Sequence, residues 1–165
     1  YARVRRLADG DDMYASKMVR HAEDRRDATH VKYDLLVDKN KGNRRLAPEF
    51  VVESFYGQLE NIFLVELSAA ARNDLDRSDE GPSGSPLILF LAGIRKCHTT
   101  FDPPISNPVY TESASTALSG YEVVDITTIQ CLVGRTKRSV EPGGHPWAII
   151  DRSTVLNRSY YVPDE

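Results

Sequence analysis

Short apolar runs alternate along this chain with clusters of glycine, proline and polar residues. The four most pronounced are Ser54–Leu67, Pro86–Cys97, Thr127–Thr136 and His145–Ser153. A fifth run, Val31–Asp38, has Val31, Tyr33, Leu35 and Val37 at every second position, as in a half-buried strand. Runs of this kind, bounded by turn residues, predict a mainly β fold in which a bent sheet forms a small barrel.

The longest apolar run, Phe50–Leu67, exceeds the length of an average strand. Gly57 lies inside it, and a glycine within a strand usually marks a bulge or a bend. The run therefore predicts one strand that bends near Gly57. Past the bend, apolar residues fall on both faces, with Phe63 on one and Leu64 on the other, which predicts burial on both sides.

The first 30 residues predict an N-terminal arm followed by a short helix. Tyr1–Leu7 alternates apolar and basic residues, as a short edge strand or a frayed arm does. After a turn, apolar residues recur at the spacing of an amphipathic helix. These positions are Tyr14, Ala15, Met18, Val19 and Ala22.

Two long stretches lack a regular apolar pattern and predict loops. Residues 68–86 are acidic and rich in serine, glycine and proline, whereas residues 98–120 contain three prolines, which disfavour regular structure. We therefore expect a single domain, residues 1–165. Its arm and helix occupy residues 1–30, and its barrel core, with both loops, occupies residues 31–165.

The C-terminal part adds further strands to the expected barrel. Tyr121–Arg138 predicts one or two strands with a break near Asp125, and Ser159–Glu165 predicts a last short strand or tail. Two cysteines do not make a disulfide framework, so Cys97 and Cys131 are expected as reduced, packed thiols. A bridge between them would require neighbouring strands in register.

Composition places the chain among ordinary globular domains. Its 165 residues are 41% hydrophobic and 27% charged, and no apolar run approaches the roughly 20 residues that cross a bilayer. The net charge of −3 is unevenly spread, since residues 1–45 hold 12 Lys and Arg against 8 Asp and Glu. The sequence predicts no membrane contact, and it leaves a basic surface near the N-terminus open as a hypothesis.

No pattern of catalytic or cofactor-binding residues accompanies these elements. The four histidines are too scattered for a metal site, and the glycine-rich phosphate loops and the GxSxG elbow are missing. We expect no enzyme activity, metal or cofactor unless the structure shows a pocket around Cys97, His98 and Asp125. Asp125 and Asp151 have basic neighbours, Arg135 and Arg152, and are expected to form structural ion pairs.

Two basic clusters on expected hairpin loops are the candidate nucleic-acid-binding residues, because lysine and arginine neutralise phosphates. They are Lys39, Lys41, Arg44 and Arg45 in the first loop, and Arg135, Lys137 and Arg138 in the second. Tyr56 and Trp147 are candidate aromatic contacts. Alternatively, the basic residues are solvated turn residues and the two aromatic residues pack in the core.

Several of these motifs resemble those of a known group of proteins. FYGQLENIFLVEL, LILFLAGIRKC, VVDITTIQCLVGR and WAIIDRS, followed by YYVPDE, are similar in order to a domain of proteins encoded by fungal transposable elements. The resemblance covers roughly Val31–Glu165 and extends to an accessory domain of plant CACTA-type transposon proteins.

A weaker resemblance is to the bromo-adjacent homology fold, so the expected barrel is either of that kind or SH3-like. Val124, Ile129 and Val133 match the segment that closes that barrel. Together the resemblances imply a non-catalytic, nuclear interaction module that contacts DNA or chromatin. The alternative is a protein–protein module that scaffolds a transposase or a related enzyme and does not touch nucleic acid.

Overall fold

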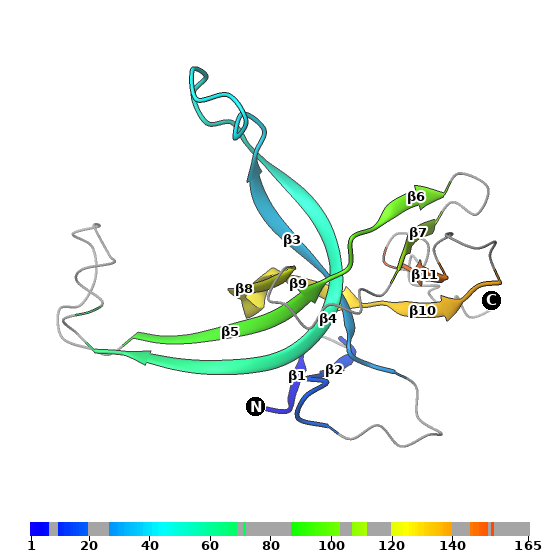
Figure 1. Ribbon diagram of the computed structural model, residues 1–165. Coiled ribbons are helices and arrows are strands. Elements are labelled where there is room, and N and C mark those ends of the chain that lie inside the picture. The colour runs from blue at the N-terminus through cyan, green and yellow to red at the C-terminus, as the bar shows by residue number, and fades with distance from the viewer. Residues whose placement is uncertain are drawn as a thin grey trace, which may run out of the picture.

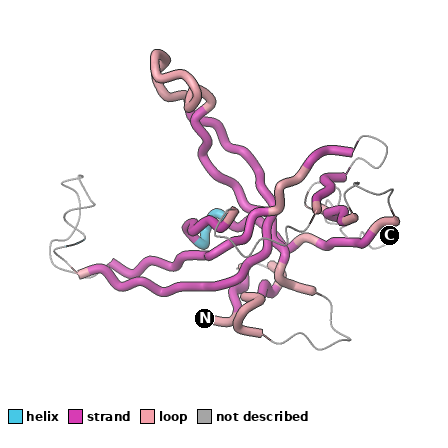
Figure 2. Tube along the Cα trace, in the orientation of Figure 1, coloured by secondary structure: helices cyan, strands magenta, loops and turns pink. Residues whose placement is uncertain are grey.

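The computed structural model describes residues 1–6, 10–19, 27–68, 71, 87–102, 107–111, 120–139, 146–151 and 153. It is mainly β, as Figures 1 and 2 show. The elements are β1 (Arg3–Arg5), β2 (Asp12–Tyr14), β3 (His30–Asp38), β4 (Phe50–Leu67), β5 (Leu87–Lys96), β6 (Thr100–Asp102), β7 (Asn107–Tyr110), β8 (Tyr121–Asp125), the 3-10 helix η1 (Ile126–Thr128), β9 (Ile129–Leu132), β10 (Gly134–Lys137) and β11 (Trp147–Ile150).

A five-stranded antiparallel sheet forms the centre of the molecule, in the order β8-β5-β4-β3-β9. β4 runs through it over 18 residues and pairs with β3 along its first part and with β5 along its second. Each pair extends beyond the sheet as a two-stranded hairpin, and the two hairpins point in different directions (Figure 1).

The direction of β4 changes at a β-bulge. Leu59 and Asn61 pair with consecutive residues of β5, so Glu60 is the extra residue on β4. The buried Glu60 carboxylate is 2.6 Å from Arg95 Nε and 2.8 Å from Lys17 Nζ, which compensates its charge. Gly57 lies nearby, and a Cβ there would lie 2.7 Å from the Arg95 carbonyl oxygen. The prediction of one strand that bends in this region is confirmed.

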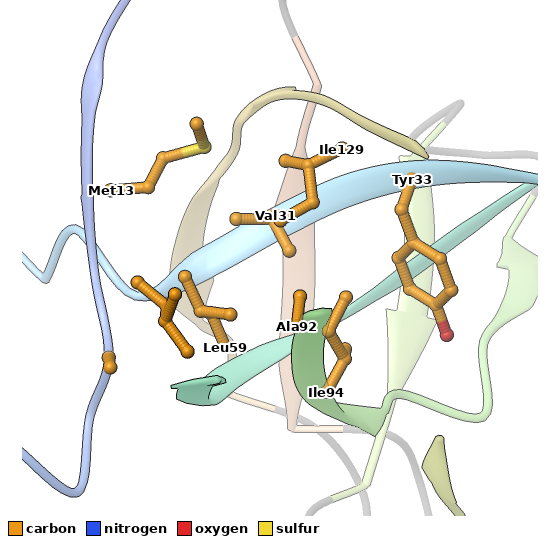
Figure 3. Close-up of a cluster of buried hydrophobic side chains, with 9 residues drawn as sticks. Met13, Val31, Tyr33, Leu59, Ala92, Ile94 and Ile129 are labelled. Carbon is orange, nitrogen blue, oxygen red and sulfur yellow. The ribbon is translucent and has the colours of Figure 1, made fainter. Parts of the chain in front are cut away.

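The main core lies on one face of this sheet (Figure 3). Strand alternation directs apolar side chains from four strands and the β2 segment into it. They are Met13, Ala15, Val31, Tyr33, Leu59, Ile62, Ala92, Ile94 and Ile129. The β1–β2 hairpin covers this face, and its attachment includes hydrogen bonds from Ser16 N to Leu59 O and from the N-terminal amine to Ile62 O, each 2.9 Å.

A second sheet and a second core lie beside the first. The sheet has the order β10-β11-β7-β6, and the core contains Cys97, Tyr110, Val133 and Ile149. Tyr56, Cys131 and Trp147 pack against that core. Both cysteines are packed thiols, as expected.

Two sequence-based expectations about architecture are wrong. None of the three sheets closes into a barrel within the described residues; the bend of β4 opens into hairpins instead. The expected N-terminal helix is not seen, because β2 and a turn occupy residues 12–18. Tyr14 N donates to Ala28 O and Ser16 N to Leu59 O, and these long-range bonds replace the pattern of a helix. The end of the expected helix, residues 20–22, lies outside the described residues.

Two further expectations, about the burial of β4 and about the loop at residues 98–120, are wrong. The outer part of β4 is not buried on both sides, since Phe63 and Leu64 are each 40% exposed. The expected loop 98–120 contains β6 and β7, and Pro108 lies within β7, opposite Phe101. Loop 68–86 and the predicted last strand, Ser159–Glu165, lie almost entirely outside the described residues.

Two expectations about single elements, a strand at Val31–Asp38 and a break near Asp125, are confirmed. Val31–Asp38 forms β3, and the chain turns at Asp125, which caps η1. Of the residues described, none belongs to a helix long and apolar enough to cross a membrane.

Candidate functional site

The first predicted basic cluster lies at the tip of the β3–β4 hairpin, which we call the basic tip (residues 39–49). Its backbone is fixed by polar side chains of its own. The Asp38 carboxylate accepts hydrogen bonds from Asn40 N and Glu49 N, both 2.9 Å, and Asn40 Nδ2 donates to Ala47 O at 2.7 Å. These bonds satisfy backbone groups that a solvent-exposed turn would otherwise leave to water, so the tip has a defined shape.

The cations of the basic tip differ in their contacts. Lys39 Nζ lies 2.8 Å from Glu49 Oε1, so its charge is partly compensated. Lys41, Arg44 and Arg45 are exposed, and within the described residues no carboxylate lies within ion-pair distance of them. Their charges are therefore available to an external anion.

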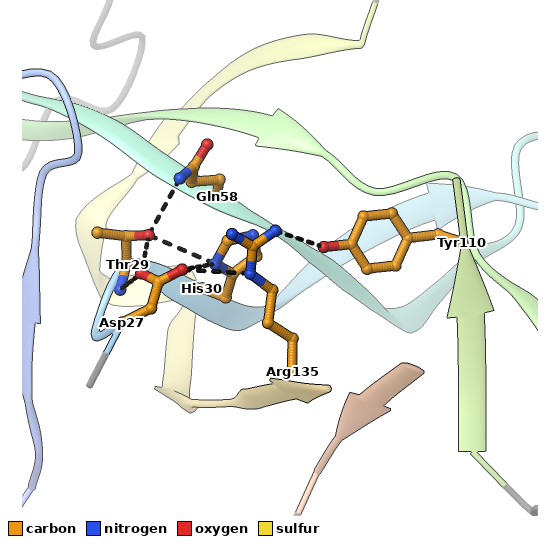
Figure 4. Close-up of polar contacts among 6 residues, drawn as sticks. All are labelled: Asp27, Thr29, His30, Gln58, Tyr110 and Arg135. Carbon is orange, nitrogen blue, oxygen red and sulfur yellow. Dashed lines mark hydrogen bonds and ion pairs between the residues drawn. The ribbon is translucent and has the colours of Figure 1, made fainter. Parts of the chain in front are cut away.

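The second predicted cluster is not arranged in this way. Arg135 is half-buried in β10, and its guanidinium is 3.2 Å from Asp27 Oδ2 and 4.3 Å from the Trp147 ring centroid. It also donates to Tyr110 Oη at 3.3 Å (Figure 4). These contacts tie β10 to the chain before β3 and to β7, which gives Arg135 a role within the fold.

Its two neighbours differ from it. Lys137 is exposed at the end of β10, and Arg138 N donates to Pro146 O at 2.7 Å. Trp147 packs against the second core and under Arg135. The structure thus brings two predicted site residues, Arg135 and Trp147, into direct contact, in a place where both serve packing.

Asp27 anchors a partly buried polar network between the two sheets (Figure 4). Its carboxylate accepts from Thr29 Oγ1 at 2.6 Å and lies 3.3 Å from Nδ1 of the buried His30. Gln58 Nε2 extends the network by donating to Thr29 Oγ1 at 3.1 Å. Burial alone would raise the pKa of Asp27, but hydrogen bonds from His30 and Thr29, with the Arg135 charge, hold it well below its usual range.

Tyr56, the other predicted aromatic contact, belongs to a similar cluster at the base of the β3–β4 hairpin. Its hydroxyl donates to Asp151 Oδ2 at 2.9 Å, and Lys32 Nζ lies 3.0 Å from the same atom. Burial, and then the bond to Asp151, raise the pKa of Tyr56. Burial alone would raise the pKa of Asp151 too, but hydrogen bonds from Ser153, Lys32 and Tyr56 lower it to about 2.

Sequence reasoning missed a local motif that builds both clusters. An aspartate two positions before a threonine or serine accepts from that residue's backbone N–H and its hydroxyl, at Oδ1. The three cases are Asp27–Thr29, Asp125–Thr127 and Asp151–Ser153. Asp-x-Thr and Asp-x-Ser beside a strand is a readable signal, since such side chains favour turns.

Of the two aspartates expected in structural ion pairs, Asp151 forms one, with Lys32 at 3.0 Å, but Asp125 does not pair with Arg135. Asp125 bonds to Thr127, while Arg135 pairs with Asp27; Arg152 lies outside the described residues. Asp125 is also remote from Cys97, because it pairs with Leu91, six residues earlier on β5, which corresponds to roughly 20 Å. Burial, and then the Asp151 charge, raise the pKa of the Cys131 thiol, which lowers its reactivity.

The site residues do not converge on one face. The basic tip lies at the far end of the β3–β4 hairpin, well away from β10, and β1 with its arginines lies on another side (Figure 1). Within the described residues, no group of three His, Cys, Asp or Glu side chains is placed to hold a metal ion. The basic tip brings together three exposed cations, Lys41, Arg44 and Arg45, that have no carboxylate partner in the described chain, whereas Lys137 is a single exposed cation on β10.

No protein-family model, curated protein or solved structure matches this chain. The geometry described above is therefore the structural basis for a function.

Proposed function

We propose that this domain is a non-catalytic module that contacts nucleic acid through the basic tip. The observation that carries the proposal is the exposure of Lys41, Arg44 and Arg45 at the end of a projecting two-stranded ribbon (Figure 1). Lysine and arginine side chains neutralise phosphates and release counterions. A two-stranded ribbon has the width that the major groove of B-DNA admits.

The resemblance of the apolar motifs to proteins of fungal transposable elements supports this proposal from another direction. A module of such a protein would work on DNA or chromatin in the nucleus. The fixed backbone of the basic tip favours such a role too, because a preorganised loop loses little conformational entropy on binding. Arg135 is excluded from the contact surface that we propose, since Asp27 and Trp147 already hold it.

The test is the salt dependence of duplex DNA binding. Each phosphate contact contributes about −0.9 to the slope of log K against log salt, so three contacts give a slope of about −3. We expect Lys41→Gln/Arg44→Gln/Arg45→Gln to remove most of that slope. Arg3→Gln is the matched control, because Arg3 is an exposed cation on β1.

Two outcomes would contradict the proposal. One is the absence of detectable DNA binding at about 50 mM salt, where phosphate contacts are strong. The other is an equal loss of affinity in Arg44→Gln and in Arg3→Gln, which would indicate nonspecific attraction by the whole molecule.

A specific observation favours a second candidate, a scaffold for a transposase or a related enzyme. Leu36 and Val52 lie directly opposite each other on the β3–β4 hairpin and are 69% and 67% exposed, and Phe50 on the same face is 62% exposed. An exposed apolar stripe of this kind is typical of a protein-binding surface. For this function we expect Val52→Glu to abolish association with the transposase of the same element. The salt slope of DNA binding should stay unchanged, and a loss of both would show that the variant is misfolded.

A further inference from the structure

The outer half of the β4–β5 hairpin has an unusual composition. It consists of Phe63–Leu67 and Leu87–Leu91, which we call the apolar ribbon, and nine of its ten residues are apolar. Its single charge is Glu66. Cross-strand pairs such as Leu64 with Phe90 and Val65 with Leu89 cover its length.

The apolar ribbon lies outside the layered part of the molecule. β8 pairs with β5 only as far as Leu91, because the chain turns at Asp125 into η1. β3 pairs with β4 only as far as Gln58. Within the described chain, both edges of the apolar ribbon therefore lack a neighbouring strand beyond these points.

Both faces of the apolar ribbon are apolar as well. Leu64, Phe90 and Ile88 continue the face that forms the core, whereas Phe63 lies on the opposite face. Ile88 is 52% exposed and Phe90 is 44% exposed. Strands that are apolar on both faces normally lie inside stacked layers, and a lone two-stranded hairpin is marginally stable in water. The apolar ribbon has the composition of a buried element in an exposed place.

We propose that a second copy of this chain docks on the apolar ribbon, with β5 pairing edge to edge with the β5 of the other copy. Leu91 already pairs with Asp125 of β8, and the open edge before it, Leu87–Phe90, contains neither the charges nor the proline with which exposed edges normally block pairing. A two-fold axis at Leu89 places Ile88 opposite Phe90 of the other copy on the same face. Such apolar cross-strand pairs stabilise antiparallel sheets.

Charge and area both agree with a second copy as the occupant. Glu66 is on β4, so the two Glu66 side chains of the dimer lie on outer strands and do not face each other. The exposed side chains of β5 beside the pairing edge, Ile88 and Phe90, present roughly 200 Å² per copy, about a quarter of what one partner buries in a standard interface. The backbone edge and the remaining leucines add to that area. The dimer is therefore concentration-dependent.

Sedimentation velocity over a range of concentrations tests the proposal. We expect the wild-type chain to approach twice its 18.5 kDa mass on the order of 100 µM, while Phe90→Glu stays monomeric. Phe101→Glu is the matched control and should dimerise, because Phe101 is an exposed phenylalanine on β6 of the other sheet. A wild-type chain that is monomeric throughout, or a Phe90→Glu variant that dimerises as the control does, overturns the proposal.

A second variant keeps the test decisive if Phe90→Glu does not fold. In the proposed pairing Leu89 faces Leu89 of the other copy, and directly paired Cα atoms lie about 4.5–5.5 Å apart, within the range of a disulfide. Leu89→Cys should therefore form a disulfide-linked dimer on mild oxidation. The wild type, whose Cys97 is buried and whose Cys131 is half-buried, is the control and should not cross-link in this way. A Leu89→Cys protein that dimerises without cross-linking overturns the edge-to-edge arrangement. Neither sedimentation nor cross-linking involves DNA, so a failure of the proposed dimer can be distinguished from a failure of the proposed DNA binding.

Discussion

The two outer parts of β4 leave the same core and present different surfaces to water. With β3, β4 forms a hairpin in which Asp34, Asp38 and Glu53 interrupt the apolar positions. With β5 it forms the apolar ribbon, whose only charge is Glu66. One strand thus supplies both a hairpin of mixed composition and a hairpin that is almost wholly apolar.

The difference shows how a projecting hairpin can be stable alone. In the β3–β4 hairpin, Ser54 Oγ donates across the strands to Asp34 at 2.7 Å, and Lys39 pairs with Glu49 near the tip. Such cross-strand pairs stabilise a hairpin that nothing else covers. The apolar ribbon has side chains that can gain free energy only by leaving water. The β3–β4 hairpin, although its exposed Leu36 and Val52 are apolar, is thus stabilised by polar pairs of its own, whereas the apolar ribbon has no such pairs in the described chain.

The largest effect is expected at the core from which the two hairpins diverge. Leu59 is fully buried beside the bulge, so Leu59→Ala should lower the free energy of unfolding by about 3 kcal/mol. Leu36→Ala makes the same chemical change on the exposed β3–β4 hairpin and should cost within about 0.5 kcal/mol. Urea unfolding of both variants measures the difference. Equal losses would mean that the β3–β4 hairpin is covered in solution and is not the water-facing element of the comparison.

The next effect concerns the base of the β3–β4 hairpin and depends on pH. The pKa of Asp151 is lowered to about 2, so its ionised form is stabilised by folding. That contribution is fully present above the unfolded pKa near 4 and is lost as pH falls toward 2. Asp151→Asn should lower stability at pH 7 by about 1–2 kcal/mol, because Lys32 and Tyr56 lose a charged partner.

Urea unfolding of Asp151→Asn and wild type from pH 7 to pH 2 checks this expectation. The difference in unfolding free energy between the two proteins should shrink as the pH falls, because the wild type loses the charge of Asp151, which the variant lacks at every pH. A difference that stays constant with pH would show that Asp151 acts by packing alone.

The elements of the central sheet could largely be predicted from the sequence, because strict alternation in Val31–Asp38 and the long run Phe50–Leu67 report local structure directly. The closure of the sheet could not be predicted. A strand pattern shows which side chains share a face, but it does not show whether another layer covers that face. Phe63 and Leu64 were therefore expected inside, although the structure leaves them partly exposed. The helix spacing of Tyr14 and its neighbours was overridden by backbone bonds to residues distant in sequence.

The candidate site, too, has one part that could be predicted from the sequence and one part that could not. The basic tip is local in sequence, so its loop and its cations could be recognised from residues 39–49 alone. The role of Arg135 depends on its contacts with Asp27 and Trp147, which are distant in the chain. The sequence of residues 135–138 does not indicate that these two residues are its partners. A charged residue in a predicted turn is therefore exposed only if no residue elsewhere in the fold forms an ion pair or a ring contact with it.

The smallest effect should separate the two hairpins without altering the core. Ser54→Ala removes the exposed bond to Asp34 and should lower the local opening free energy of the β3–β4 hairpin by about 0.5 kcal/mol. Native-state hydrogen exchange should show faster exchange for amides of this hairpin and unchanged exchange for those of the apolar ribbon, because local openings are independent of each other. Thr136→Ala, which removes an exposed hydroxyl on β10, is the control and should leave both hairpins unchanged. If Ser54→Ala accelerates exchange in the apolar ribbon equally, β4 opens as one unit, and the contrast between its two ends is one of composition alone.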